Sequence, residues 1–303
     1  MLVRVGSDGE PVPSSAEKWK AVSPTVIDVT LRKGMRWHDG KPVTVEDVKF
    51  TYDYYKKWKI AYYLGALEPI NDVKILNNET VRFTLKEPYA PILIATFSRI
   101  MLLPKHIWEN VVEQRKLKSP EEWENPHPIG NGPFKFVHWR RGEELVCDRF
   151  DDYFSPSKFS KLIAKKYSNK DGLFLGLLKG DIDINFQDLL PSQVNEGKQN
   201  KDLTMVLTGD FGVNFLFLNQ RKAPSSDRQF LRAIAYTINR DLIVEIMQGY
   251  AEKGVGWIAP ENRAWHNKQI KPHEYSLEKA RKILTDAGYE WDSDGRLYYP
   301  AKK

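Results

Sequence analysis

Strand patterns and helix patterns follow one another irregularly along this chain, and several strand patterns are separated only by a short turn. Residues 27–31 alternate apolar and polar side chains, which is the period of a half-buried strand. Residues 71–87 contain two such runs, so they predict a hairpin, and residues 134–146 predict another. Hairpins mixed with helices favour a mixed sheet over a strictly alternating parallel barrel. The sequence therefore predicts an α/β fold of the mixed α+β kind.

Helix starts are marked by side chains that can cap the first turn. Thr44 with Asp47 three residues later fits a capping box, and Val48, Tyr52 and Tyr55 then fall on one face. We therefore expect an amphipathic helix that begins after Thr44.

The C-terminal part of the chain changes character and becomes richer in helix patterns. Asp227, Asp241 and Ser276 can each cap a helix, and Gly249 and Gly288 can end the last two.

Near the other end of the chain, we expect a short helix over residues 16–21. Further strands are expected at residues 182–186, 203–207 and 213–218.

The composition is that of a soluble globular protein: 303 residues, enough for two or three domains, of which 41% are hydrophobic and 28% charged. The 46 basic residues are interleaved with 40 acidic ones, so the net charge of +6 is not gathered in the stripe typical of nucleic-acid binders. No apolar stretch approaches the roughly 18 residues needed to span a bilayer. Residues 1–9 lack the apolar run of a signal peptide, so we expect any export signal to lie outside this chain.

Sequence patterns typical of catalysis or metal binding are absent. Cys147 is the one cysteine, which excludes an intrachain disulfide and predicts a buried thiol. The chain has no Gly-x-Ser-x-Gly motif and no glycine-rich phosphate loop, and its six histidines form no His-x-x-x-His pair. Residues 292–295 resemble the start of a calcium loop but lack its bidentate glutamate. We therefore expect no catalytic residue, no metal site and no cofactor, which favours a binding protein.

Four segments of the chain, taken in order and at their spacing, resemble one family. They are residues 31–50 (LRKGMRWHDGKPVTVEDVKF), 128–136 (PIGNGPFKF), 179–184 (KGDIDI) and 217–241. Together they resemble the periplasmic oligopeptide-binding proteins, which are the extracellular solute-binding protein family 5 components of ABC transporters. Most of these residues suit turns, caps and close backbone approaches, so they indicate fold rather than direct ligand contact.

The resemblance implies periplasmic-binding-protein-like lobes with mixed sheets, in the class that has an extra small domain. It implies a small second domain at residues 1–124, part of the first (lobe I) domain at 125–212 and the beginning of the third (lobe II) domain at 213–303. Members of the family are usually longer, so the chain resembles an internal fragment. The acidic residue that typically holds a peptide's amino terminus in this family is expected beyond its end.

The resemblance also implies which residues contact a ligand in the cleft. Rings stack on apolar faces and amides fix polar edges, so a wall of both suits peptides and oligosaccharides alike. Each of these residues has an ordinary alternative, which is packing in the core or at the surface. The ligand-binding residues expected from the resemblance are Tyr62, Tyr63, Phe186, Gln187, Asp188, Phe211, Asn214 and Phe215. Trp257 and Trp265 are added because they follow in a loop-like stretch.

The function that the resemblance implies is that of an extracytoplasmic receptor that delivers peptides or oligosaccharides to an ABC importer without breaking a bond. The expected partners are the ligand and the ABC transporter permease in the membrane, with no nucleic acid, and the protein is expected to be a monomer. It is expected in the periplasm or outside the cell, held at the membrane by a lipid anchor or by the permease. The alternatives are a hydrolase that uses cleft carboxylates and a ligand sensor on the same fold.

Overall fold

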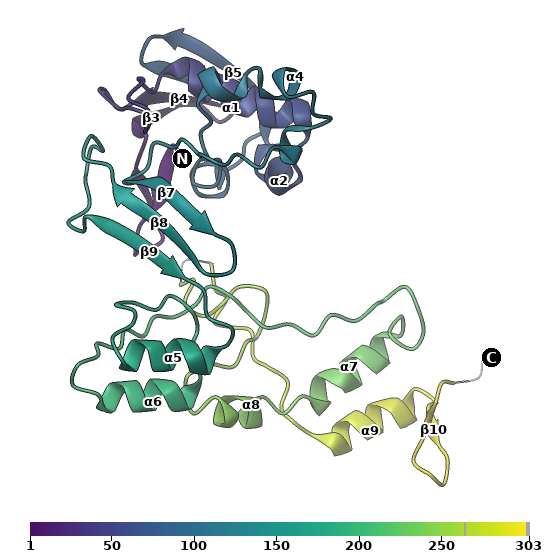
Figure 1. The fold of residues 1–303 in the computed structure, drawn as a ribbon. Helices are drawn as coiled ribbons and strands as arrows, with labels where there is room; N and C mark the ends of the chain where they lie inside the picture. Colours follow the sequence, from purple (N-terminus) through teal and green to yellow (C-terminus); the bar gives the residue numbers. More distant parts are fainter. Residues whose placement is uncertain (264, 301–303) are drawn as a thin grey trace. The chain divides into compact units, whose positions relative to one another are not determined.

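A four-stranded antiparallel sheet in the order β3-β4-β6-β5 organises the N-terminal part of the chain (Figure 1). Val29 and Val81 lie opposite each other on its buried face, because apolar residues alternate along β4 and β6. On the other face, Arg82 donates two hydrogen bonds to the Asp28 carboxylate, at 2.7 and 2.9 Å. The hairpin predicted over residues 71–87 is confirmed. The strands are β3 (Ala16–Ser23), β4 (Val26–Leu31), β5 (Ile70–Asn77) and β6 (Thr80–Leu85).

Helix α1 (Val45–Trp58) packs against β5 and β6. Its start confirms the predicted capping box, since the Thr44 backbone N–H donates to the Asp47 carboxylate at 2.9 Å. The same carboxylate is 5% exposed and accepts from Trp37 Nε1 at 3.2 Å and from the Lys105 backbone N–H at 2.8 Å. A buried carboxylate needs such donors, so Asp47 ties the helix start to two segments distant in sequence.

The core of this region is closed and rich in aromatic rings. Tyr52 of α1, Phe83 of β6 and Phe97 are fully buried, and the Phe83 ring centroid lies 4.9 Å from that of Tyr52 and 4.6 Å from that of Phe97. The predicted helix face at Val48, Tyr52 and Tyr55 is therefore confirmed. The shorter elements around this core are β1 (Val3–Val5), β2 (Pro11–Pro13), η1 (Ala61–Tyr63), α2 (Leu64–Leu67), η2 (Ile92–Phe97), α3 (Lys105–Trp108), α4 (Val111–Gln114) and η3 (Pro120–Glu122).

A three-stranded antiparallel sheet in the order β7-β8-β9 follows, with β7 and β8 forming the predicted second hairpin. Its strands are β7 (Phe134–Arg140), β8 (Glu144–Arg149) and β9 (Lys161–Lys165). Cys147 lies on β8 and is half-buried rather than fully buried. Burial raises the pKa of its thiol, and the neighbouring Asp148 carboxylate acts in the same direction.

The structure is a computed structural model that describes residues 1–263 and 265–300, and it divides into two compact units, Met1–Tyr167 and Ser168–Lys303. The two sheets above belong to the first unit. The three-part division at residues 1–124, 125–212 and 213–303 stays a prediction.

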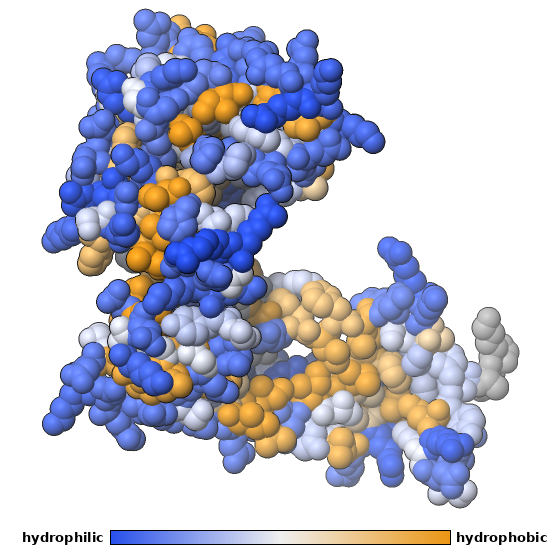
Figure 2. Space-filling view, viewed as in Figure 1, coloured by the Kyte–Doolittle hydropathy of each residue, from blue (hydrophilic) through white to orange (hydrophobic). Residues whose placement is uncertain are grey.

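The described part of the second unit is built mainly from helices. Helices α7 and α9 pack together around Ala233, Ala280, Leu284 and Tyr289, and the Tyr289 hydroxyl donates to the Asp227 carboxylate at 2.9 Å. Figure 2 shows apolar side chains gathered over the surface of α7 and α8. The elements are α5 (Lys170–Leu178), α6 (Pro191–Gln199), α7 (Arg228–Thr237), α8 (Arg240–Ile246), α9 (Leu277–Asp286), β10 (Glu290–Trp291) and β11 (Leu297–Tyr298).

Two of the three predicted caps in this unit are confirmed. The side chains of Asp227 and Ser276 each accept a backbone N–H from the first turn of the helix that follows. The prediction for Asp241 is wrong, because α8 begins one residue before it. Asn239 is the cap of α8, and its side chain accepts from the Leu242 N–H at 3.0 Å. Asp241 lies inside the first turn, so it is not the residue at the non-helical boundary that a cap occupies.

Four other sequence predictions are corrected by the structure. Residues 16–21 belong to strand β3, not to a helix, because Trp19 pairs with Val29 of β4 and its ring packs on the core. Sheet pairing here outweighs the helix propensity of the local residues. No strand forms at residues 182–186, 203–207 or 213–218. Alternation along a segment indicates strand propensity, but a strand also needs a neighbouring backbone with which to pair.

Candidate functional site

Tyr62 and Tyr63 lie together in η1, the turn that follows α1. Helix α1 ends at Trp58, and its C-cap Lys59 has a left-handed backbone (φ 50°) that redirects the chain. The Tyr63 ring packs on Tyr55 with ring centroids 4.4 Å apart, and Tyr62 meets Tyr63 edge to face at 5.0 Å. Tyr62 is 82% exposed. The structure therefore anchors one ring of the predicted pair and presents the other to solvent.

Burial decides the chemistry of these tyrosines. It raises the pKa of Tyr55 and also that of Tyr63, so both phenols stay protonated at physiological pH. The Tyr55 hydroxyl donates to the Met101 carbonyl at 3.1 Å. The Tyr55 and Tyr63 phenols therefore cannot act as bases at neutral pH, and the Tyr55 proton is already used inside the protein.

Phe186, Gln187 and Asp188 form an exposed stretch in the second unit. Asn185 shapes it, because its side chain accepts from the Gln187 N–H at 2.7 Å and donates to the Gln187 carbonyl at 3.0 Å. Such a local turn leaves the Phe186 ring free of the core, at 84% exposed. The family resemblance indicated these three residues but not Asn185, whose type and position are typical of a side-chain turn.

Phe215 and Trp257 come together in a ring cluster that also contains Phe217. The Phe215 centroid lies 4.7 Å from that of Trp257, and the Phe217 centroid lies 5.6 Å from each of the other two. Trp257 is 74% exposed and Phe217 is 71% exposed, so much of this apolar surface faces solvent. Phe217 was not among the residues expected from the sequence. Its position two residues after Phe215 could have indicated it, since alternate residues of an extended chain share a face.

The remaining expected residues lie outside this ring cluster. Phe211 and Asn214 are exposed on the same segment as Phe215. Trp265 is exposed as well, and its backbone N–H donates to the Asn262 carbonyl at 3.0 Å. The structure thus gathers part of the predicted wall of rings in the second unit.

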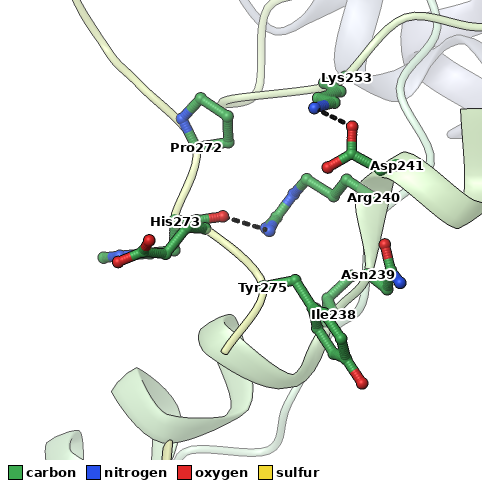
Figure 3. Close-up of a pocket in the computed structure, with 9 residues that line it drawn as sticks. Ile238, Asn239, Arg240, Asp241, Lys253, Pro272, His273 and Tyr275 are labelled. Atoms are coloured by element: carbon green, nitrogen blue, oxygen red, sulfur yellow. Dashed lines mark hydrogen bonds and ion pairs between the residues drawn. The ribbon is translucent and has the colours of Figure 1, made fainter. Parts of the chain in front are cut away.

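A pocket of about 560 Å³ lies where the start of α8 meets residues 272–275 (Figure 3). In it Lys253 pairs with Asp241, and Arg240 donates to the His273 carbonyl at 3.4 Å. Lys253, Asp241 and Arg240 are therefore already engaged in part by partners within the protein. None of the expected ligand-binding residues lines the pocket, and the Asn-Arg-Asp sequence at its edge was interpreted only as a helix boundary. Its lining residues are Ile238, Asn239, Arg240, Asp241, Lys253, Pro272, His273, Glu274 and Tyr275.

Within residues 1–263 and 265–300, no group of three or more His, Cys, Asp and Glu side chains is arranged to hold a metal ion. None of the helices there combines the length and apolarity of a transmembrane span.

The fold is that of the periplasmic solute-binding proteins, as predicted. The chain superposes with a TM-score of 0.84 on NikZ from Campylobacter jejuni, solved in complex with Ni(L-His); the two are 27% identical, and the match covers 98% of this chain and 59% of that one. It also superposes with a TM-score of 0.76 on the oligopeptide-binding protein AppA from Bacillus subtilis, solved with a nonapeptide. Those two chains are 26% identical, with 98% and 60% covered.

The sequence identifies the family within this class. The chain belongs to the bacterial extracellular solute-binding proteins, family 5, whose family model matches residues 10–303. It is 28% identical over 274 residues to a putative ABC transporter peptide-binding protein of Brucella ovis, a match that covers 89% of this chain and 50% of that protein. The chain therefore spans about half the length of the curated relatives that it matches.

Proposed function

We propose that this chain is part of an extracytoplasmic receptor that captures peptides and delivers them to an ABC importer. The match of the family 5 model over residues 10–303 is the observation that carries the proposal. Two further observations support it. The Brucella relative is named as a peptide-binding protein, and the similar AppA chain was solved with a nonapeptide.

The exposed rings are the surfaces that we propose for ligand contact. A peptide offers apolar side chains that can lie on Trp257 and Phe215, and its backbone amides can bond to neighbouring polar groups such as Asn214. Tyr62 can stack in the same way and can also donate a hydrogen bond. Oligosaccharides have apolar faces as well, so they stay an alternative ligand class for these rings.

The proposed mechanism is capture without chemistry. Binding to the native state but not to the unfolded chain stabilises the protein, and release to a permease returns the ligand unchanged. The rivals are a hydrolase that uses cleft carboxylates and a ligand sensor on the same fold. The proposal includes a periplasmic or extracellular location, attachment to the membrane by a lipid anchor or through the permease, a monomeric state and the domain division at 1–124, 125–212 and 213–303.

A thermal-shift screen of the native protein with di- to nonapeptides and small oligosaccharides tests this function. A ligand present at a hundred times its Kd is expected to stabilise the fold by about 2.7 kcal/mol, so the midpoint should rise with ligand concentration. Mass spectrometry of the recovered ligand should show it intact. If nucleic acid shifts the midpoint and no peptide or sugar does, the transport function is wrong. Cleaved peptide would establish the hydrolase instead.

A pair of tryptophan variants tests the ring surface. Trp257→Ala should weaken peptide binding by about tenfold, which is the loss of about 1.4 kcal/mol expected where a tryptophan is one of the few residues that dominate binding. Trp139→Ala is the matched control, because Trp139 is also an exposed tryptophan but lies on β7 and outside the expected site. Equal affinities of the two variants would remove Trp257 from the site.

A further inference from the structure

His38 lies in the turn that precedes α1 and meets the backbone of residues 130–132 at three points. Its backbone N–H donates to the Gly130 carbonyl at 2.8 Å. The Gly130 N–H in turn donates to His38 Nδ1 at 3.2 Å, and His38 Nε2 lies 3.0 Å from the Gly132 carbonyl oxygen. His38 thus uses both of its ring nitrogens and its backbone N–H to hold residues 130–132.

These contacts define the protonation state of the ring. A backbone N–H can only donate, so Nδ1 must be the unprotonated acceptor, and Nε2 then carries the proton that it donates to the Gly132 carbonyl. A doubly protonated ring would place an Nδ1–H against the Gly130 N–H. Only the neutral imidazole satisfies both partners.

The held segment joins two parts of the first unit. The His38 turn is tied to α1 through Trp37, whose indole donates to Asp47, whereas residues 130–132 lead directly into β7. The His38 ring also meets Phe150 edge to face at 5.0 Å. The fit is tight, because a Cβ on Gly130 would lie 3.3 Å from the ring carbon Cε1 of His38.

We propose that His38 is a pH-responsive latch, in which protonation of Nδ1 at acid pH removes the acceptor for the Gly130 N–H and loosens the joint between the α1 side of the unit and the entry to β7. No bond is made or broken other than these hydrogen bonds. The three-stranded sheet then gains freedom relative to the four-stranded sheet within the same unit.

The surroundings of His38 oppose protonation at neutral pH. Burial lowers the pKa of the ring, and the Lys135 ammonium on β7 acts in the same direction. The hydrogen bond to the Gly132 carbonyl and the Asp39 carboxylate act the other way. Because the net shift is downward, the contribution of the latch is complete above the ordinary histidine value of 6.5 and is lost as the pH falls below it.

Asp39 is the nearby anion that could stabilise a charged His38, but it already has partners. Its carboxylate lies 2.7 Å from Nε2 of His106 and accepts from the Lys41 backbone N–H at 3.2 Å. Partial burial raises the pKa of Asp39, but these hydrogen bonds outweigh it and hold the pKa below its usual value. His106 is therefore the rival sensor that an experiment must separate from His38.

Nitrogen NMR of the wild-type protein tests the proposed tautomer directly. The ¹⁵N shifts at pH 7.5 should show His38 protonated at Nε2 and not at Nδ1, and the ring should titrate below the range of a free histidine. An Nδ1–H tautomer, or titration at or above the ordinary value, would overturn the latch.

Amide hydrogen exchange tests the release of the joint. After correction for intrinsic exchange, protection of the Gly130 amide should fall by roughly three- to tenfold between pH 7.5 and 5, as expected for loss of one hydrogen bond. His38→Asn keeps an acceptor close to the position of Nδ1 and cannot titrate, so it should abolish this fall. Constant protection in the wild type, or an equal fall in His38→Asn, contradicts the proposal.

Two other histidine variants serve as matched controls. His106→Gln and His138→Gln each remove an imidazole from the first unit but leave the contacts of His38 with Gly130 in place. Both should retain the loss of Gly130 protection at acid pH. If His106→Gln abolishes it, the sensor is His106, and the assignment to His38 is wrong.

Discussion

The two units of this chain differ in how they bury apolar side chains. In the first unit, α1 and the four-stranded sheet close over a continuous core that runs from Leu2 to Leu103 in sequence. In the described part of the second unit, the core cluster consists of Ala233, Ala280, Leu284 and Tyr289. Helix α8 leaves Leu242, Ile243 and Ile246 exposed, and Met247, its C-cap, is exposed as well.

This difference shows in which unit local sequence patterns are sufficient to predict the structure. In the first unit each amphipathic segment has a partner across a sheet or under a helix, so its apolar face is covered. In the second unit the same kinds of pattern occur, but strand-like segments such as 213–218 are unpaired. Stability should therefore depend on packing in the first unit and more on local caps in the second.

The largest expected effect comes from Phe83, at the centre of the first core. Phe83→Ala removes a fully buried ring that touches Tyr52 and Phe97, so it should lower the free energy of unfolding by about 3–5 kcal/mol. Phe217→Ala removes the same side chain from an exposed cluster and should change it by about 0.5 kcal/mol or less. Urea unfolding followed by circular dichroism measures both. Similar losses for the two variants would end the contrast between the units.

The next effect concerns the cap of α8. Asn239→Ala removes the acceptor for the Leu242 N–H and should cost about 1 kcal/mol. Asp241→Ala removes a side chain that is 74% exposed and pairs only at the surface with Lys253, so the cost should be below about 0.5 kcal/mol. Thermal unfolding followed by circular dichroism at the wavelengths of the helix signal distinguishes the two variants. A larger loss for Asp241→Ala would restore the sequence prediction that Asp241 is the cap.

The smallest expected effect is a change in how the stability of the first unit depends on pH in the acid range. The hydrogen bond from Arg82 lowers the pKa of Asp28 below its ordinary 3.8, although burial acts the other way. The resulting stability is present above that ordinary value and is lost as the pH falls through the lowered one. Asp28→Asn should therefore flatten the dependence of stability on pH below about 4. Glu274→Gln, which breaks an exposed pair with Lys279 in the second unit, is the comparison variant.

Much of the first unit could be predicted from the sequence. The strand at residues 27–31, the capping box at Thr44 and the hairpin at 71–87 depend on neighbours close in the chain, and the structure confirms all three. The helix predicted at residues 16–21 failed because its competing state, a strand paired with β4, is stabilised by burial of Trp19 on a core assembled from distant segments. Propensity does not contain that information.

The candidate site was predictable only in part. The resemblance to oligopeptide-binding proteins indicated Phe215, and a loop-like stretch indicated Trp257. These residues lie 42 positions apart in sequence, and the structure brings their rings into contact. The Phe217 ring also packs in this cluster, although it was not expected to, whereas Phe211 lies outside it. Side-chain contacts of this kind depend on how loops fold over one another, and the spacing of residues in one segment does not specify that.

The sequence by itself determined the family, the turns, the caps and the period of most strands and helices, because each is encoded by residues within a few positions of one another. Tertiary structure decided which of these segments acquired partners. The Asp28–Arg82 pair joins residues 54 positions apart, and the His38–Gly130 contact joins residues 92 positions apart. Hydrogen bonds and burial over such separations form only when the whole unit is assembled, so no local pattern can specify them.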